Sequence, residues 1–290
     1  MLVKFILAFF MAVALVGCAT APKQTEAFLK AERQIPDQQK ITTVPFIQQK
    51  ANYCGPASLA MVMNWAGLQI SMDQLAKHTF TPGQNGALQA DMLSTVRRNG
   101  MIPIYVRGIN PLLTELAAGR PVIVLQNLAL SFAPQWHYAV ALGYDLETVE
   151  LILHSGRNKF ETMKLRNFEP TWELGKFWGM VVLKPGELAA SADEMQHTQA
   201  AATLESMGQT SAAEKTYQAV LNRWPQSLTA YLGLGNVAYA RREYSQSVEF
   251  LTKATSLHPE QPMGWHNLAL AQEAAGLKLQ ARVSAQKALS

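Results

Sequence analysis

Cysteine is scarce in this sequence, whose 290 residues contain only Cys18 and Cys54. No Cys-x-x-Cys or His-x-x-x-His pair is present, so a structural zinc site is not expected, and no motif indicates a cofactor. Excess charge is also small, because 25 Lys and Arg against 21 Asp and Glu leave a net charge of +4 with no concentrated basic block. This balance gives no support to nucleic-acid binding.

Long apolar runs are missing except at the N-terminus. Lys4 precedes an apolar run over residues 5–16, which is too short to cross a bilayer and predicts a secretory signal peptide over residues 1–17. The sequence Leu15-Val16-Gly17-Cys18 resembles the lipobox of bacterial lipoproteins, which implies cleavage before Cys18 and acylation of that cysteine. An ordinary signal peptide with an accidental cysteine, or an uncleaved anchor, is the alternative.

The predicted acylation determines how the two cysteines are used. Several acyl chains on Cys18 would anchor the protein durably, and Ala at position 19 favours the outer membrane by the sorting rule of that family. We therefore expect a lipoprotein on the periplasmic side of the bacterial envelope. Cys54 is then the single remaining thiol, and an unpaired cysteine in an exported protein is either buried and inert or reactive.

Composition divides the rest of the chain into four segments. Residues 18–40 are polar and punctuated by Pro, and predict a lipidated tether. Residues 41–185 alternate helix-like and strand-like stretches, which predicts a mixed domain. Residues 186–193 are small and polar and predict a linker, and residues 194–290 show helical periodicity without strands.

The helical segment repeats with a period of 34 residues. Pro225 and Pro259 have this spacing, and so do Gly208, Arg242 and Gly276. The period resembles that of the tetratricopeptide repeat, in which stacked helix pairs share a core that no pair has alone. The resemblance implies a concave face that binds a peptide or a protein partner. It also implies three units, over residues 194–227, 228–261 and 262–290.

Cys54 stands at the predicted start of a helix. It precedes Gly55-Pro56, and Pro is tolerated in a first helical turn because its missing N–H has no helical partner there. A thiol at a helix N-terminus lies at the positive end of the helix dipole, which favours the nucleophilic thiolate. A structural cysteine is the alternative, because the helix carries an apolar stripe that predicts its burial. The stripe consists of Leu59, Val62, Met63 and Ala66.

His137 begins a second informative stretch, HYAVALGYD, which predicts a strand. A lone histidine in an apolar strand is more often a core residue. However, papain-like enzymes pair a thiol at a helix start with an imidazole that is distant in sequence and adjacent in space. YCGPASLAMVMNWAG and HYAVALGYD together resemble the C39 family of cysteine peptidases and its C39-like relatives. The resemblance covers residues 41–185 and implies a papain-like α+β fold, with an antiparallel sheet packed on helices.

The same resemblance assigns roles to individual residues. Cys54 corresponds to the nucleophile, and His137 corresponds to the general base that later acts as the general acid. In this family a Gln five or six residues before the nucleophile donates to the oxyanion, and both Gln48 and Gln49 stand at that distance.

The orienting Asp that the family places downstream of the histidine is missing, since residues 151–158 read LILHSGRN. A two-residue hairpin turn before this segment would place His154 and Asn158 on the face of His137. Asn158 is the most attractive orienting residue, because an amide oxygen can accept a hydrogen bond from the imidazole. His154 and Ser155 are further candidates, and a bulge would exchange the two faces.

These features predict an envelope-anchored cysteine peptidase that hydrolyses peptide bonds through Cys54 and His137, while the repeats recruit a protein partner or the substrate. One alternative is a catalytically inactive, C39-like scaffold that binds peptides, which the missing acidic residue favours. A second alternative is a thiol amidase or acyltransferase that acts on a non-peptide substrate such as a cell-wall fragment. An apolar pocket would favour peptide over glycan.

Overall fold

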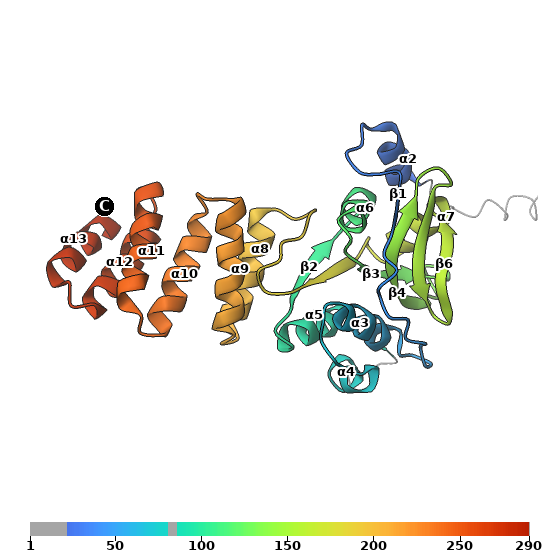
Figure 1. The fold of residues 1–290 in the computed structure, drawn as a ribbon, viewed down its shortest axis with the longest axis horizontal. Helices are drawn as coiled ribbons and strands as arrows, with labels where there is room; N and C mark the ends of the chain where they lie inside the picture. Colours follow the sequence, from blue (N-terminus) through green and yellow to red (C-terminus); the bar gives the residue numbers. More distant parts are fainter. Residues whose placement is uncertain (1–21, 81–85, 290) are drawn as a thin grey trace, which may run out of the picture.

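The computed structural model describes residues 22–80 and 86–289. Figure 1 shows a sheet surrounded by helices, from which a row of further helices extends toward the C-terminus. The predicted signal peptide and Cys18 lie outside the described residues. In the part of the chain that is described, no helix combines the length and the apolar character that a membrane span requires.

The centre of the first part is an antiparallel sheet, as the sequence predicted. Within the described residues its strands follow the order β2-β7-β3-β4-β5-β6, and β1 pairs with β4 outside this path. The strands are β1 (Gln38–Lys40), β2 (Ile102–Val106), β3 (Val122–Asn127), β4 (Trp136–Asp145), β5 (Glu150–Ser155), β6 (Asn158–Lys164) and β7 (Gly179–Leu183). Every residue of β3 is buried, which agrees with the unbroken apolar run at its start.

Helices cover both faces of this sheet. α3 packs on β3 and β4 and contacts α4 and α5, whereas α2 contacts α6 and α7. In Figure 1, α3, α4 and α5 lie together in the lower part of the sheet domain, and α2 and α6 lie in its upper part. These helices are α2 (Lys23–Lys30), α3 (Cys54–Trp65), α4 (Met72–Thr79), α5 (Gln89–Arg98), α6 (Ile109–Ala117) and α7 (Leu165–Leu174).

Helix α3 is buried on all sides rather than along one stripe. Every residue from 55 to 63 is inaccessible to solvent or nearly so. Gly55 is required at the start of this run, because a Cβ there would lie 2.6 Å from the Cβ of Ala87 and 3.1 Å from Sδ of Met92. The helix is therefore the central packing element of the domain, and its first residue is Cys54.

The segment that was predicted to be a tether is largely folded onto the domain. Its residues form α2 and β1, and the buried carboxylate of Glu169 on α7 accepts three hydrogen bonds from the start of α2. The donors are the backbone N–H of Gln24 (2.8 Å), the backbone N–H of Thr25 (2.7 Å) and the Thr25 hydroxyl (2.6 Å). The sequence prediction failed here because the partner carboxylate lies about 145 residues away along the chain.

The C-terminal part consists of helix pairs, as the 34-residue period indicated. The first helices of successive pairs begin at residues 194, 228 and 262. Small residues allow close packing within a pair, since a Cβ on Gly235 would lie 2.5 Å from Cγ of Leu251. The helices are α8 (Glu194–Ser206), α9 (Thr210–Arg223), α10 (Leu228–Ala240), α11 (Tyr244–Leu257), α12 (Pro262–Ala274) and α13 (Lys278–Leu289).

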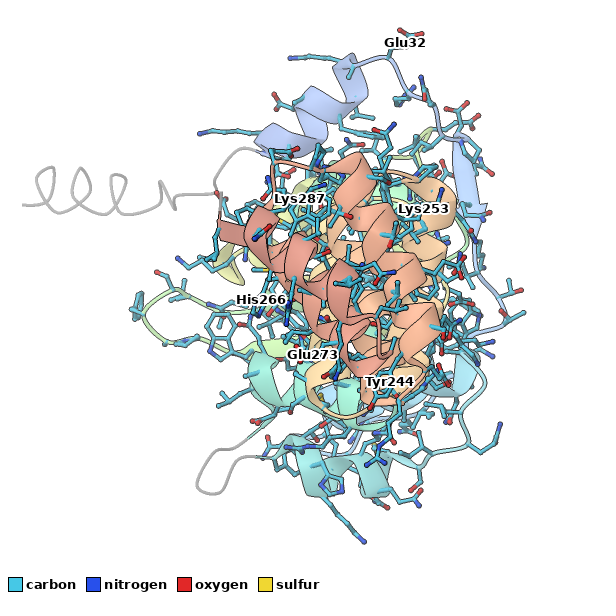
Figure 2. The ribbon with its side chains drawn as sticks, turned by 90° about the vertical axis from the view of Figure 1, so that its left-hand side faces the viewer. Glu32, Tyr244, Lys253, His266, Glu273 and Lys287 are labelled. Atoms are coloured by element: carbon cyan, nitrogen blue, oxygen red, sulfur yellow. The ribbon has the colours of Figure 1, made fainter. Side chains whose placement is uncertain are left out.

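The outer end of this row exposes both charged and large apolar side chains, the apolar ones including Leu279, Val283 and Leu289 on α13. Figure 2 views the molecule from that end and shows Lys253, His266 and Glu273 on the helices nearest the viewer. All three side chains are exposed.

The predicted linker is also packed in place. Ala189 and Ala192 are buried, and the backbone N–H of Ser191 donates to the buried carboxylate of Glu115 at 2.6 Å. Just after the C-terminal end of α8, the side-chain amide of Gln209 donates to the carbonyl of Arg97 at 2.7 Å. These contacts attach the first helix pair directly to the sheet domain, and one hydrophobic core runs through both.

Replacing Glu169 tests whether the N-terminal segment is part of the domain. Glu169→Gln keeps the size of the side chain but leaves a buried donor of α2 facing an amide N–H₂. We expect a loss of about 2–3 kcal/mol in the free energy of unfolding, because charge-assisted hydrogen bonds are lost and a donor is left unsatisfied. Urea denaturation measures this difference.

The matched control is Glu173→Gln, an exposed carboxylate on the same helix, for which the expected change is within about 0.5 kcal/mol. Equal, small effects of the two substitutions would show that α2 is a loose tether after all.

Candidate active site

Cys54 lies at the point where a short loop enters the core. The loop turns at Lys50, whose carbonyl accepts a hydrogen bond from the backbone N–H of Tyr53 at 3.1 Å. Asn52 adopts a left-handed backbone conformation with φ of 64°, which asparagine tolerates better than most residues. The turn delivers Cys54 to the first position of α3, where its side chain is half-buried and is not part of a disulfide.

The start of α3 lies against the beginning of β4. Tyr138 packs close to Gly55, and its hydroxyl donates to the carbonyl of Ala87 at 3.2 Å. Cys54 and Tyr138 both line a cavity of about 570 Å³. Tyr138 follows His137 in β4, so the start of α3 lies against the strand one residue from His137.

The imidazole of His137 is held by a hydroxyl. Nε2 lies 3.0 Å from Oγ of Ser155 on β5. Neither a bond at Nδ1 nor a bond between His137 and Cys54 is found among the residues described. If Nε2 carries the ring proton and donates a hydrogen bond to Oγ of Ser155, Nδ1 is the nitrogen that can accept a proton from a thiol.

The surroundings of His137 keep its ring neutral. Burial lowers the pKa of His137, and the carboxylate of Glu161 on β6 opposes this effect by favouring the charged ring. Because burial outweighs Glu161, the pKa of His137 lies below that of an exposed histidine. The ring is therefore an unprotonated base at neutral pH.

The register of the β4–β5 hairpin differs from the predicted one. The connection spans residues 146–149 rather than two residues, and the pairing shifts by one residue between Ala141 and Gly143. Val140 consequently pairs with His154. This bulge exchanges the two faces of β5, so Ser155 rather than His154 shares a face with His137.

His154 and Asn158 have structural surroundings instead. His154 is fully buried, its Nδ1 accepts from the backbone N–H of Phe160 at 3.1 Å, and its Nε2 lies 3.4 Å from the carbonyl of Val44. Asn158 is exposed at the first position of β6, opposite Ser155. Neither has a hydrogen bond to His137 in the described part of the chain, whereas Ser155, the third candidate, lies at hydrogen-bond distance from its Nε2.

The two candidate glutamines are distinguished by their positions. Gln49 is half-buried, its backbone N–H donates to the carbonyl of Gly156, and its side-chain amide donates to the carbonyl of Tyr138 at 3.4 Å. Gln48 is exposed. The structure thus holds Gln49, rather than Gln48, beside the start of β4.

Glu161 is the residue near His137 that the sequence did not single out. It lies on β6, opposite Leu153, and its electrostatic effect reaches His137. Successive side chains of a strand point to opposite faces of the sheet. Once the bulge in β4 is known, this alternation followed across β5 and β6 places Glu161 on the face of His137. Within the described residues, no cluster of three or more His, Cys, Asp or Glu side chains could hold a metal ion.

Comparison with known proteins agrees with this architecture. Residues 41–180, slightly less than half of the chain, match the model of the "Peptidase_C39 like family". The first part of the chain is thus a C39-like peptidase domain, and it is followed by an all-helical region. No functionally curated protein matches the chain.

Solved structures with similar folds include two peptidases and a chaperone. A C39-like peptidase from Bacillus anthracis is 19% identical, with a TM-score of 0.42 over 51% of this chain and 98% of that chain. The peptidase domain of Streptococcus ComA is 20% identical, with a TM-score of 0.40 over 48% and 98%. The Yersinia enterocolitica secretion chaperone SycD is 19% identical, with a TM-score of 0.32 over 33% and 72%.

Charge substitutions beside His137 test the arrangement of the site. Glu161→Gln should lower the pKa of His137 further, because it removes the carboxylate that favours the charged ring. Ser155→Asp should raise that pKa, because it places a carboxylate at Nε2. NMR titration of the imidazole resonances measures both shifts.

Glu147→Gln provides the matched control, because Glu147 is an exposed carboxylate in the β4–β5 connection and should leave the pKa of His137 unchanged. If Ser155→Asp left that pKa unchanged as well, Ser155 would not be the partner of His137 in solution.

Proposed function

We propose that this protein is an envelope-anchored cysteine peptidase that hydrolyses peptide bonds through Cys54 and His137. The observation that carries the proposal is the position of Cys54 at the first residue of a buried helix, against β4 at the residue next to His137. The match of residues 41–180 to a C39-like peptidase family supports it.

The reaction begins when the thiolate of Cys54 attacks the carbonyl carbon of the substrate. The neutral ring of His137 accepts the thiol proton, and the ring is held through Nε2 by Ser155. The protonated ring then donates that proton to the leaving amine, and the C–N bond breaks to leave an acyl-enzyme. His137 next takes a proton from water, whose oxygen attacks the thioester and releases the acid.

The negatively charged oxygen of the tetrahedral intermediate needs two hydrogen-bond donors. The backbone N–H of Cys54 has no hydrogen-bond acceptor in the parts of the chain that are described, as expected for the first residue of a helix. The side-chain amide of Gln49 is the second donor, and it is held beside β4 by its backbone bond to Gly156. Donors placed before the reaction stabilise charge that develops in the transition state.

The cavity beside Cys54 supports a peptide rather than a glycan as the substrate. Most of its larger side chains are aliphatic or aromatic, among them Leu125, Trp136 and Tyr138. Sugars are recognised through many hydrogen-bonding groups, whereas apolar walls bind hydrocarbon side chains. The helix pairs would recruit a protein partner or the substrate through a tetratricopeptide-like concave face.

A second candidate function is peptide binding without cleavage. It is favoured by the hydroxyl of Ser155 at Nε2 of His137, where a peptidase of this type would place a carboxylate, and by the lack of a described hydrogen bond between Cys54 and His137. Hydrogen bonds of a catalytic pair are often long in the free enzyme and tighten only with substrate bound.

Two measurements on purified protein distinguish catalysis from binding. A mixed peptide library followed by mass spectrometry should show cleavage that Cys54→Ala abolishes. His137→Ala should lower cleavage by about 100-fold or more, because the base is lost. It should also lower the rate of Cys54 alkylation by iodoacetamide at pH 6.5 by about tenfold.

His78→Ala is the control, since His78 is an exposed histidine on α4, and it should change neither rate. Absence of cleavage together with an alkylation rate that His137→Ala does not alter would rule out the peptidase and leave the peptide-binding function.

Anchoring through Cys18 is tested by metabolic labelling with a radioactive fatty acid in a bacterial host. Label should enter the wild-type protein and Cys54→Ala but not Cys18→Ala, because the acyl groups are attached to Cys18. Labelling of Cys18→Ala, or of none of the three proteins, would remove the anchor from the proposal.

A further inference from the structure

The cavity beside Cys54 has an exposed apolar rim. Three large apolar side chains line it while remaining substantially open to solvent: Trp136 (51% exposed), Leu88 (48%) and Leu174 (39%). Leu125 and Tyr138 form its buried wall. Exposed apolar side chains gathered at one cavity indicate a surface that is covered by a ligand.

The described lining contains a single charged residue, Lys176, and no carboxylate. Lys176 is exposed, and its ammonium group forms no ion pair or hydrogen bond with any residue that the structure describes. An unpaired cation at the edge of an apolar cavity favours a ligand that brings a carboxylate with its apolar group.

The backbone fixes Lys176 at this edge. Lys176 and Phe177 both have left-handed conformations, with φ of 59° and 51°. The N–H of Lys176 donates to the carbonyl of Glu173 at 2.8 Å, and the N–H of Phe177 donates to that of Trp172 at 3.0 Å. Two consecutive non-glycine residues in this region are strained, and such strain persists only where the surrounding structure determines it. The end of α7 therefore presents Lys176 in a defined place.

We propose that Lys176 is a specificity-determining residue of this site, and that the substrate is a peptide segment in which a bulky apolar residue near the cleaved bond is flanked by Asp or Glu. The inference rests on the proposed peptidase function. The half-exposed rim at Trp136 and Leu88 leaves the cavity open for a chain that continues past it. We therefore assign the carboxylate to a side chain within the peptide rather than to its C-terminus.

The first test reports the charge at the site without requiring cleavage. It compares alkylation of Cys54 by anionic iodoacetate with alkylation by neutral iodoacetamide, resolved from Cys18 by mass spectrometry of the Cys54 peptide. At low salt, Lys176→Met should lower the ratio of the two rates by about two- to threefold, and Lys176→Glu by about five- to tenfold.

Lys215→Met is the matched control, because Lys215 is exposed on α9 in the helical region, and it should leave the ratio unchanged. A ratio that is the same in Lys176→Glu and the wild-type protein overturns the role of Lys176.

The second test compares peptides that differ at one position beside a Leu, with Glu, Gln or Lys there, each with a free or an amidated C-terminus. The wild-type protein should cleave the Glu peptide with kcat/KM about five- to tenfold above the Gln peptide, mainly through KM. Lys176→Glu should reverse the order of the Glu and Lys peptides. The state of the C-terminus should have no effect.

The outcomes separate the two proposals. Equal cleavage of the three peptides overturns the specificity inference and leaves the peptidase standing, and a preference that requires a free C-terminus overturns the assignment to an internal side chain. Absence of all cleavage overturns the peptidase. In that case, stronger protection of Cys54 from iodoacetamide by the Glu peptide than by the Lys peptide supports the recognition role of Lys176, and equal protection overturns it.

Discussion

The burial of α3 on every side is the constraint on which the rest of the site depends. Residues 55–63 are enclosed by the sheet and by α4 and α5, so this helix cannot move or turn without opening the core. Gly55 tightens the constraint, because any larger residue would collide with Ala87. Cys54 is therefore held at the boundary between core and solvent, half-buried, with its backbone N–H free at the helix end. The remaining parts of the site come from loops and from the ends of strands and helices that surround Cys54.

The sequence predicted those features that depend on local pattern, and missed those that depend on one residue of register or on a distant partner. Helix α3 and the 34-residue period were readable, because each is repeated over many positions. The face of the sheet on which Ser155 lies could not be predicted. The bulge between Ala141 and Gly143 shifts the strand pairing by one residue, and no clear sequence pattern indicates it. Docking of α2 was also hidden, because its polar segment is stabilised by Glu169, far along the chain.

The first helix pair of the helical region is attached to the peptidase domain through buried and part-buried polar contacts. The buried carboxylate of Glu115 accepts a hydrogen bond from the backbone N–H of Ser191, and the guanidinium of Arg223 donates to the carbonyl of Ala189 at 3.2 Å. Buried polar contacts of this kind are costly to break, because each leaves an unsatisfied group behind. A partner held on the helix pairs would therefore meet the peptidase domain in a restricted range of orientations, which raises its effective concentration at the cavity beside Cys54.

In the proposed peptidase, activation of the thiol and selection of the substrate would depend on different elements, and so they could be altered separately. His137, Ser155 and Glu161 lie on three consecutive strands of one meander, and their hydrogen bond and charges act on the imidazole. Leu174 is the last residue of α7 and Lys176 follows it with a left-handed backbone, and both line the cavity. A charge change at Lys176 alters the field that a substrate meets on entry while leaving the burial of His137 unchanged. Burial and Glu161 are the influences on the pKa of His137, and Lys176 is not among them. If the proposed function holds, replacement of Lys176 would therefore change which peptides bind without changing how the thiol is activated.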